Sequence, residues 1–105
     1  MTTGAPEGVP VERRVAEHRF AVEVDGNTAE LTYDLGGDRL VLVHTGVPGE
    51  IERRGIGGRL VEAAIEWAAA QGLTVVPLCP FVRWWLRAHP DVAAKVTIDW
   101  TTRAR

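Results

Sequence analysis

The spacing of apolar residues in the first half of this chain predicts a set of antiparallel strands. Residues 18–27 and 28–35 each alternate apolar and polar side chains, as strands with one buried face do. Asp25-Gly26-Asn27 ends the first of these segments and is typical of a tight hairpin turn, because glycine and asparagine tolerate positive φ angles. Residues 39–47 follow and are apolar on both faces from Leu40 to Val43. We therefore expect an antiparallel meander whose third strand is covered on both sides.

The second half of the chain predicts a helix between two strands that pair in parallel. From Gly57 onward, apolar residues recur at helical spacing and form one stripe, and Gly72 is placed to end that helix. Residues 73–79 form a short apolar run typical of a strand buried on both faces. This order favours a right-handed crossover with parallel pairing. A further helix is predicted over residues 80–89 and a weak edge strand over 95–100, so the predicted fold class is mixed α/β (α+β), in the order βββαβα with a weakly indicated closing strand.

The composition is that of a single small domain in an ordinary soluble protein. The chain has 105 residues, of which 46% are apolar and 25% charged. We expect a flexible tail over residues 1–14 and one domain over residues 15–105. The formal net charge is −2 and there is no basic run, which argues against a nucleic-acid partner. No apolar run approaches the ~20 residues of a membrane span, and the single cysteine, Cys79, suits a reducing compartment, so we expect a cytoplasmic protein with no membrane partner.

Three glycines, Gly55, Gly57 and Gly58, stand where the long helix is predicted to begin. Each lowers helix stability by ~1 kcal/mol relative to alanine, so another property must require them. One explanation is close packing of the helix start on the sheet. The other is an anion cradle, because the first amides of a helix lack intrahelical partners and glycine lets phosphate oxygens reach them. Arg53 and Arg54 would add positive charge for a diphosphate, although the spacing matches neither a P-loop nor a dinucleotide-binding fingerprint.

Residues 44–90 resemble the GNAT acetyltransferase superfamily, and more closely its small YjdJ-type or NATD-like branch of N-acetyltransferases. Three features carry the resemblance: the His-Thr-x-Val-Pro segment that starts at His44, the Arg-Gly-x-Gly loop at Arg54 that opens a helix, and "VVPLCPF" followed by a helix that ends in His-Pro. The likeness extends over most of the chain, from about Phe20 to Pro90. It implies a compact GNAT-like fold with an antiparallel meander, a glycine-loop helix, a splayed parallel strand and a final helix.

The resemblance also implies acetyl-CoA as co-substrate, with its diphosphate held by backbone amides of the glycine loop and its pantetheine arm in the gap between the splayed strands. The first position of the superfamily's loop pattern falls on Glu52, whose acidic side chain cannot donate to phosphate. The neighbouring backbone and arginines must therefore contribute more. The residues predicted to bind the cofactor are Thr45, Val47, Arg53, Arg54, Gly55, Ile56, Gly57 and Gly58.

Acetyl transfer to an amine requires a base, donors for the oxyanion and an acid for the leaving thiolate. Larger GNAT enzymes often place a tyrosine as this acid at the start of the last helix, where this chain has Phe81, and Tyr33 is predicted to lie in the core. Cys79, as the predicted N-cap, could serve as the acid, as a polar anchor or as a transient acetyl acceptor, or it is a small buried residue. His44 is either a base or backbone organiser at the mouth of the splay, or a satisfied core histidine.

The predicted function is acetyl-CoA-dependent N-acetyl transfer, direct and within a ternary complex, to an amine that is a small molecule or a protein. The alternatives are a non-catalytic CoA-binding or protein-interaction module, or an acyl acceptor based on Cys79. No metal is predicted, since the histidines show no ligand spacing. Trp67, Trp84 and Trp85 are predicted to line the cleft in part or to form an interface, which leaves both a monomer and a homodimer open.

Overall fold

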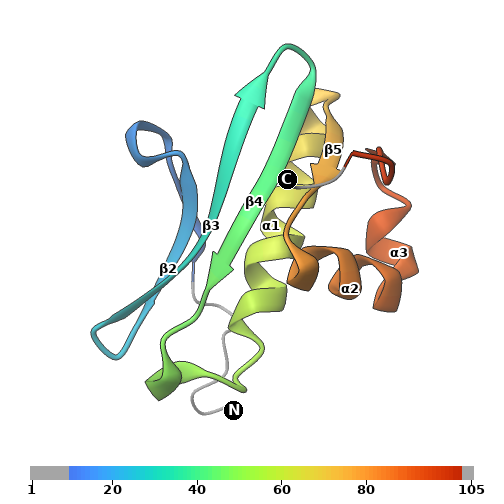
Figure 1. The fold of residues 1–105 in the computed structure, drawn as a ribbon. Coiled ribbons are helices and arrows are strands. Elements are labelled where there is room, and N and C mark those ends of the chain that lie inside the picture. Colours follow the sequence, from blue (N-terminus) through green and yellow to red (C-terminus); the bar gives the residue numbers. More distant parts are fainter. Residues whose placement is uncertain (1–9, 103–105) are drawn as a thin grey trace.

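The computed structural model describes residues 10–102, which form one six-stranded sheet and three α-helices (Figure 1). The strands lie in the sheet in chain order, antiparallel from β1 to β4 and parallel from β4 to β6. Their bounds are β1 Glu12–Arg14, β2 Arg19–Val24, β3 Asn27–Gly36, β4 Arg39–Gly46, β5 Thr74–Pro77 and β6 Thr97–Ile98. The helices are α1 Ile56–Gln71, α2 Pro80–Ala88 and α3 Pro90–Ala93, with 3₁₀ turns at Val15–Glu17 and Gly49–Ile51.

This architecture confirms the predicted fold class and element order. Val24 pairs with Asn27 across the predicted hairpin, and both intervening residues, Asp25 and Gly26, have positive φ. Gly72 ends α1 in a left-handed conformation, as predicted. The closing strand forms as β6, next to β5. Pro90 both ends the preceding helix and occupies the first position of α3, which was not predicted.

The hydrophobic core lies between the sheet and the helices. Leu60 and Ile65 of α1 and Leu86 of α2 are fully buried in one cluster with inward-facing residues of the sheet, such as Leu31 and Leu42. α1 packs against β2, β3, β4 and β5, and α2 packs against β4 and β5. Within the described residues, no helix is both long and apolar enough to cross a membrane.

The prediction that the third strand is covered on both sides is wrong. Leu40 and Leu42 are fully buried, but Val41 is only half-buried and the exposed fraction of Val43 is 39%. The side chains of β4 alternate between two faces, and only the face with Leu40 and Leu42 contributes to the core shared with the helices. Val41 and Val43, on the other face, therefore reflect the high strand propensity of valine rather than a second covered face.

The predicted flexible tail over residues 1–14 is wrong at its last three residues. Glu12–Arg14 form β1, which pairs antiparallel with Arg19–Ala21. A strand of three residues is too short to show alternation, so its pairing could not be seen in the sequence. Residues 1–9 of the predicted tail lie outside the described residues, and the sheet begins before the predicted domain boundary at residue 15.

The feature that positions the site is the separation of β4 from β5. The parallel pairing ends at Leu42 opposite Pro77, where the Leu42 carbonyl accepts hydrogen bonds from the amides of Leu78, at 3.0 Å, and Cys79, at 3.1 Å. A β-bulge interrupts the β3–β4 pairing at the same level, since Tyr33 pairs with Leu42 and Thr32 with His44. Beyond this point β5 turns into α2, whereas β4 continues to Gly46. The last residues of β4 thus have β3 on one side and no strand on the other within residues 10–102.

Candidate active site

A cleft of about 1030 Å³ opens where β4 separates from β5. Three parts of the chain enclose it: the end of β4, the loop that leads into α1 with the first turns of that helix, and one face of α2. The lining residues are His44, Thr45, Gly46, Val47, Glu52, Arg53, Gly55, Ile56, Gly57, Gly58, Arg59, Glu62, Phe81, Trp84, Trp85 and His89. The structure therefore brings together most of the residues that were predicted from the sequence as a cofactor site.

The glycine loop presents the start of α1 to this cleft. Gly55 is the N-cap and has a φ of 74°, a left-handed conformation that glycine adopts without steric cost. The first hydrogen bond of the helix runs from the Arg59 amide to the Gly55 carbonyl, at 3.1 Å. The amides of Ile56, Gly57 and Gly58 precede this bond and have no intrahelical acceptor. They lie at the positive end of the helix dipole, which suits them to an anionic group.

Gly57 and Gly58 have a second role, which is to let α2 approach α1. A Cβ atom added to Gly57 would lie 2.8 Å from Cζ of Phe81, and one added to Gly58 would lie 2.5 Å from Nε1 of Trp85. Both distances are too short for real atoms, so the two rings pack directly on bare backbone. The glycines thus permit close packing, as one explanation proposed, but the predicted partner is wrong: the helix start packs on α2 and not on the sheet. Both rings also line the cleft, so the glycines that this packing requires lie at the predicted cofactor site.

The two arginines before the glycines point to different places. Arg53 lines the cleft and has a positive φ of 68°. Arg54 does not line it, because its Nη1 donates a hydrogen bond to Oδ2 of Asp25, at 2.9 Å, in the β2–β3 turn. The structure therefore brings Arg53 to the predicted diphosphate site and not Arg54. Glu52 also lines the cleft, where it adds negative charge to the mouth of the loop.

Cys79 is buried, with an exposed fraction of 4%, and is the N-cap of α2. Its Sγ lies 3.4 Å from Oγ1 of Thr45, and either atom can be the donor. Thr45 lines the cleft, whereas Cys79 does not. The thiol therefore reaches the cleft through the threonine hydroxyl. Cys79 is both a small buried residue and a direct neighbour of the site. Its burial therefore does not exclude a role as acid or as polar anchor.

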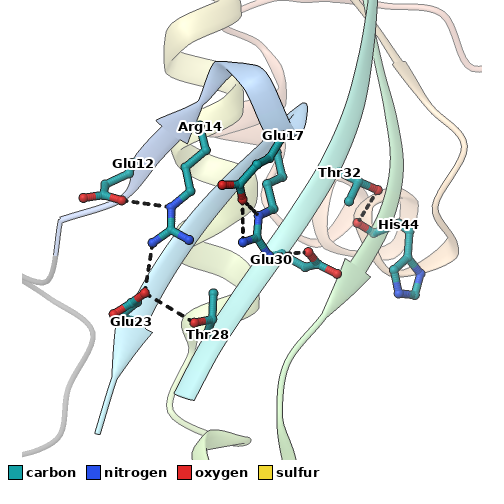
Figure 2. Close-up of polar contacts among 9 residues, drawn as sticks. Glu12, Arg14, Glu17, Glu23, Thr28, Glu30, Thr32 and His44 are labelled. Atoms are coloured by element: carbon teal, nitrogen blue, oxygen red, sulfur yellow. Dashed lines mark hydrogen bonds and ion pairs between the residues drawn. The ribbon is translucent and has the colours of Figure 1, made fainter. Parts of the chain in front are cut away.

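His44 lies on the opposite side of β4 from Cys79. It pairs with Thr32, whose side chain belongs to the polar face of the sheet, and its carbonyl accepts a hydrogen bond from Oγ1 of Thr32 at 3.3 Å (Figure 2). The side chain of the next residue, Thr45, points to the core face, as strand alternation requires. His44 is exposed, so the prediction of a satisfied core histidine is wrong.

The remaining aromatic and histidine side chains divide between the core and the cleft. Tyr33 is buried, as predicted, and its hydroxyl accepts a hydrogen bond from Nη1 of Arg13 at 3.1 Å. Trp84 and Trp85 line the cleft, but Trp67 packs against Phe20 and beneath the Arg13 guanidinium, away from it. The ring of His89 stacks on Trp85 with centroids 3.8 Å apart, and its Nδ1 contacts the Trp85 carbonyl at 2.8 Å.

Two charged residues of the cleft, Arg59 and Glu62, are not among the site residues predicted from the sequence. Their position in the first two turns of α1 could have indicated this, because side chains so close to the glycine loop lie near the predicted cofactor site. In the described part of the chain, no group of three or more His, Cys, Asp or Glu side chains is arranged to hold a metal ion.

An antiparallel meander, a helix opened by glycines and a parallel strand that parts from the meander define the acetyltransferase type of α/β fold that the resemblance implied. A family model of GCN5-related N-acetyltransferases matches residues 19–96, and the chain belongs to this family. The predicted superfamily is thereby confirmed, while the small branch within it stays a prediction. Membership makes the protein an acetyltransferase by class.

Comparison with solved structures supports the same fold. The chain is similar to the NMR solution structure of a GCN5-like protein from Staphylococcus aureus, with a TM-score of 0.66 and 24% sequence identity. The match covers 89% of this chain and 93% of that chain. At this identity the likeness concerns the fold alone. A comparison with curated proteins gave no match.

Proposed function

We propose that this protein is an acetyl-CoA-dependent N-acetyltransferase that passes the acetyl group directly to an amine in a ternary complex. The observation that supports this most strongly is the separation of β4 from β5 beyond Leu42 and Pro77. It exposes the last residues of β4 as a free strand edge at the mouth of the cleft. An extended chain with amide groups can bind such an edge as an added strand does, and the pantetheine arm of CoA is a chain of this kind.

The diphosphate of the cofactor would bind at the start of α1. The amides of Ile56, Gly57 and Gly58 supply donors there, and Arg53 supplies positive charge. Glu52 and Glu62 line the same cleft and repel phosphate, so the diphosphate is expected close to the helix end and to Arg53. Arg54 has no part in this proposal, because it is paired with Asp25.

The two faces of β4 suggest how the chemistry is divided. His44, on the polar face, is proposed to take a proton from the acceptor ammonium, and the neutral amine then attacks the carbonyl carbon of the thioester. As the carbon–sulfur bond breaks, the thiolate leaves on the core face and takes a proton from the Thr45 hydroxyl. The Cys79 thiol then gives its own proton to the Thr45 oxygen across the 3.4 Å contact. Backbone N–H groups of the free β4 edge are the donors available to the oxyanion.

The burial of Cys79 favours this direct route over an acetylated cysteine. Its side chain is in the core, and an acetyl group on Sγ would need space that the packed interior does not offer. Transfer through the cysteine would therefore require α2 to move away from β4. Direct attack requires only that the amine reach the thioester in the gap between the strands.

Binding and turnover test the proposal separately. Calorimetry with CoA should give a saturable isotherm, and acetyl-CoA with a panel of amines should release free thiol only when an acceptor is present. Mass spectrometry after incubation with acetyl-CoA alone should find no adduct on Cys79. Absence of CoA binding at high micromolar ligand would refute the proposal. CoA binding without turnover would favour a non-catalytic module, and a stable adduct on Cys79 would favour the acyl acceptor.

A further inference from the structure

On the polar face of the sheet, Gly46 separates the imidazole of His44 from the carboxylate of Glu30. Glu30 on β3 is the register partner of Gly46 on β4. A Cβ atom added to Gly46 would lie 3.6 Å from Nε2 of His44 and 3.7 Å from Oε2 of Glu30. The two polar atoms therefore flank one open place above the glycine. Gly46 and His44 line the cleft and Glu30 does not, so this place lies at the edge of the cleft.

The carboxylate of Glu30 is held in position by one of its two oxygens. Oε1 accepts a hydrogen bond from Nη1 of Arg19 at 2.8 Å, and the same guanidinium also pairs with Glu17 (Figure 2). Two carboxylates thus share one arginine, which leaves this group of three side chains with a net negative charge. Oε2 of Glu30 receives no hydrogen bond from the described residues, and it is the oxygen that faces the place above Gly46.

We propose that this place is the acceptor subsite, which binds the substrate amine as an ammonium between Oε2 of Glu30 and Nε2 of His44. The inference rests on the proposed function and assigns it a substrate class, which is a primary alkylamine that is charged at neutral pH. A carboxylate attracts such an ammonium by charge, which strengthens the hydrogen bond, and a neutral arylamine lacks this attraction. The subsite lies on the polar face, so the acceptor and the CoA thiolate occupy opposite sides of β4.

The subsite supplies the proton transfer that the reaction requires. The ammonium donates one hydrogen bond to Glu30, which remains ionised, and loses a proton from another N–H to Nε2 of His44. The lone pair so released attacks the thioester carbonyl carbon in the gap next to Gly46, and the carbon–sulfur bond breaks. Glu30 touches the acceptor but exchanges no proton with it, so it acts as a specificity residue.

The test compares Glu30→Gln with Glu23→Gln. Glu23 lies on the same face of the sheet and is likewise paired with an arginine, Arg14 (Figure 2), but it pairs with Thr28 on β3 and is not among the residues nearest to Gly46. We expect Glu30→Gln to raise the KM for spermidine and for a lysine-containing peptide about tenfold or more, as the loss of a charge-assisted hydrogen bond does. The KM for acetyl-CoA should not change, and Glu23→Gln should change neither constant.

The peptide and the polyamine distinguish two sources of the same ammonium group, and 4-methoxyaniline serves as a neutral acceptor. Glu30→Gln should leave the KM for this arylamine unchanged. An unchanged KM for both alkylamines, or an equal rise for the arylamine, would overturn the subsite. The alkylamine with the lower wild-type KM indicates whether the natural acceptor resembles a polyamine or a protein side chain.

Gly46→Ala tests the space itself. Its Cβ would make only ordinary contacts, so the fold should be kept, while the methyl group fills the place between the two side chains. We expect the thermal midpoint and the Kd for CoA to stay constant and the KM for alkylamines to rise. Wild-type values of that KM in Gly46→Ala would overturn the inference.

A readout that does not depend on turnover separates this inference from the proposed function. Spermidine should shift the NMR signals of the His44 ring in the wild type and not in Glu30→Gln. If the wild type bound no CoA and transferred no acetyl group, the proposed function would fail, and the His44 signals would still decide whether the ammonium site exists. Absence of any shift in the wild type would refute the site.

Discussion

Oγ1 of Thr45 lies 3.4 Å from Sγ of Cys79, just beyond the point where β4 and β5 stop pairing. One of these residues lines the cleft and the other is buried. The contact thus joins the two strands through side chains where their backbones have separated. It also gives a buried thiol a hydrogen-bonded route to the place where the CoA sulfur is proposed to lie.

Removal of the Thr45 hydroxyl should slow the chemical step without weakening the binding of CoA. Thr45→Val keeps the shape of the side chain but removes the proton donor, so we expect kcat to fall by about a hundredfold, the lower end of general acid catalysis. The Kd for CoA should change little, because the backbone of the strand edge is intact. Cys79→Ser, which keeps a donor, should retain more activity than Cys79→Ala. Full kcat in Thr45→Val would exclude the relay.

Adjacent arginines provide a matched pair for the diphosphate site. Arg53→Ala should weaken CoA binding about fivefold, or about 1 kcal/mol, because it removes a charge that lines the cleft. Arg54→Ala should change the Kd by less than about twofold, since that side chain is paired with Asp25. Titration calorimetry at two salt concentrations measures both, and the difference should shrink at high salt. Equal losses in the two variants would contradict the assignment.

Alanine at Gly57 should destabilise the fold through the Phe81 ring. The added Cβ would lie 2.8 Å from Cζ of that ring, and overpacking of this kind costs about 1–3 kcal/mol. The better helix propensity of alanine offsets about 1 kcal/mol of this cost. We expect the free energy of unfolding to fall by about 1 kcal/mol and the Tm by about 4 °C in scanning calorimetry. Gly36→Ala, where nothing lies within 4 Å, is the control and should not lower the Tm.

Asp99 should make stability depend on acid pH. Hydrogen bonds from the hydroxyl and then the amide of Thr101, followed by those from Arg39 and Thr102, hold the pKa of its carboxyl well below its ordinary value of 3.8. A lowered pKa in the folded state stabilises the fold fully above the unfolded-state pKa, and this contribution is lost as the pH falls toward the folded-state pKa. Asp99→Asn should therefore lower the Tm most above pH 5, and the difference from the wild type should shrink below pH 3.8. A difference that stays constant from pH 7 to pH 2 would show that the carboxylate charge is not responsible.

Local patterns in the sequence determined the secondary structure. The alternation in residues 18–35, the Asp25-Gly26 turn and the helical stripe that ends at Gly72 each depend on neighbours in the chain, and all three are found in the structure. The glycine loop was also recognisable, because Gly55, Gly57 and Gly58 stand together where the helical stripe begins. The exception is β1, whose three residues are too few for a pattern and form a strand only because β2 offers an edge.

Only the tertiary structure decided which side chains meet. Arg53 and Arg54 look equivalent in the sequence, yet Asp25, in a turn 29 residues earlier in the chain, pairs with Arg54 and holds it away from the cleft. The bulge at the level of Val43 sets the faces of His44 and Thr45, and so places His44 on the same face of the sheet as Glu30, and Thr45 beside Cys79. Hydrophobic periodicity records how a residue relates to its own helix or strand. Contacts between distant segments depend on register and packing between elements, and these are determined by the whole fold.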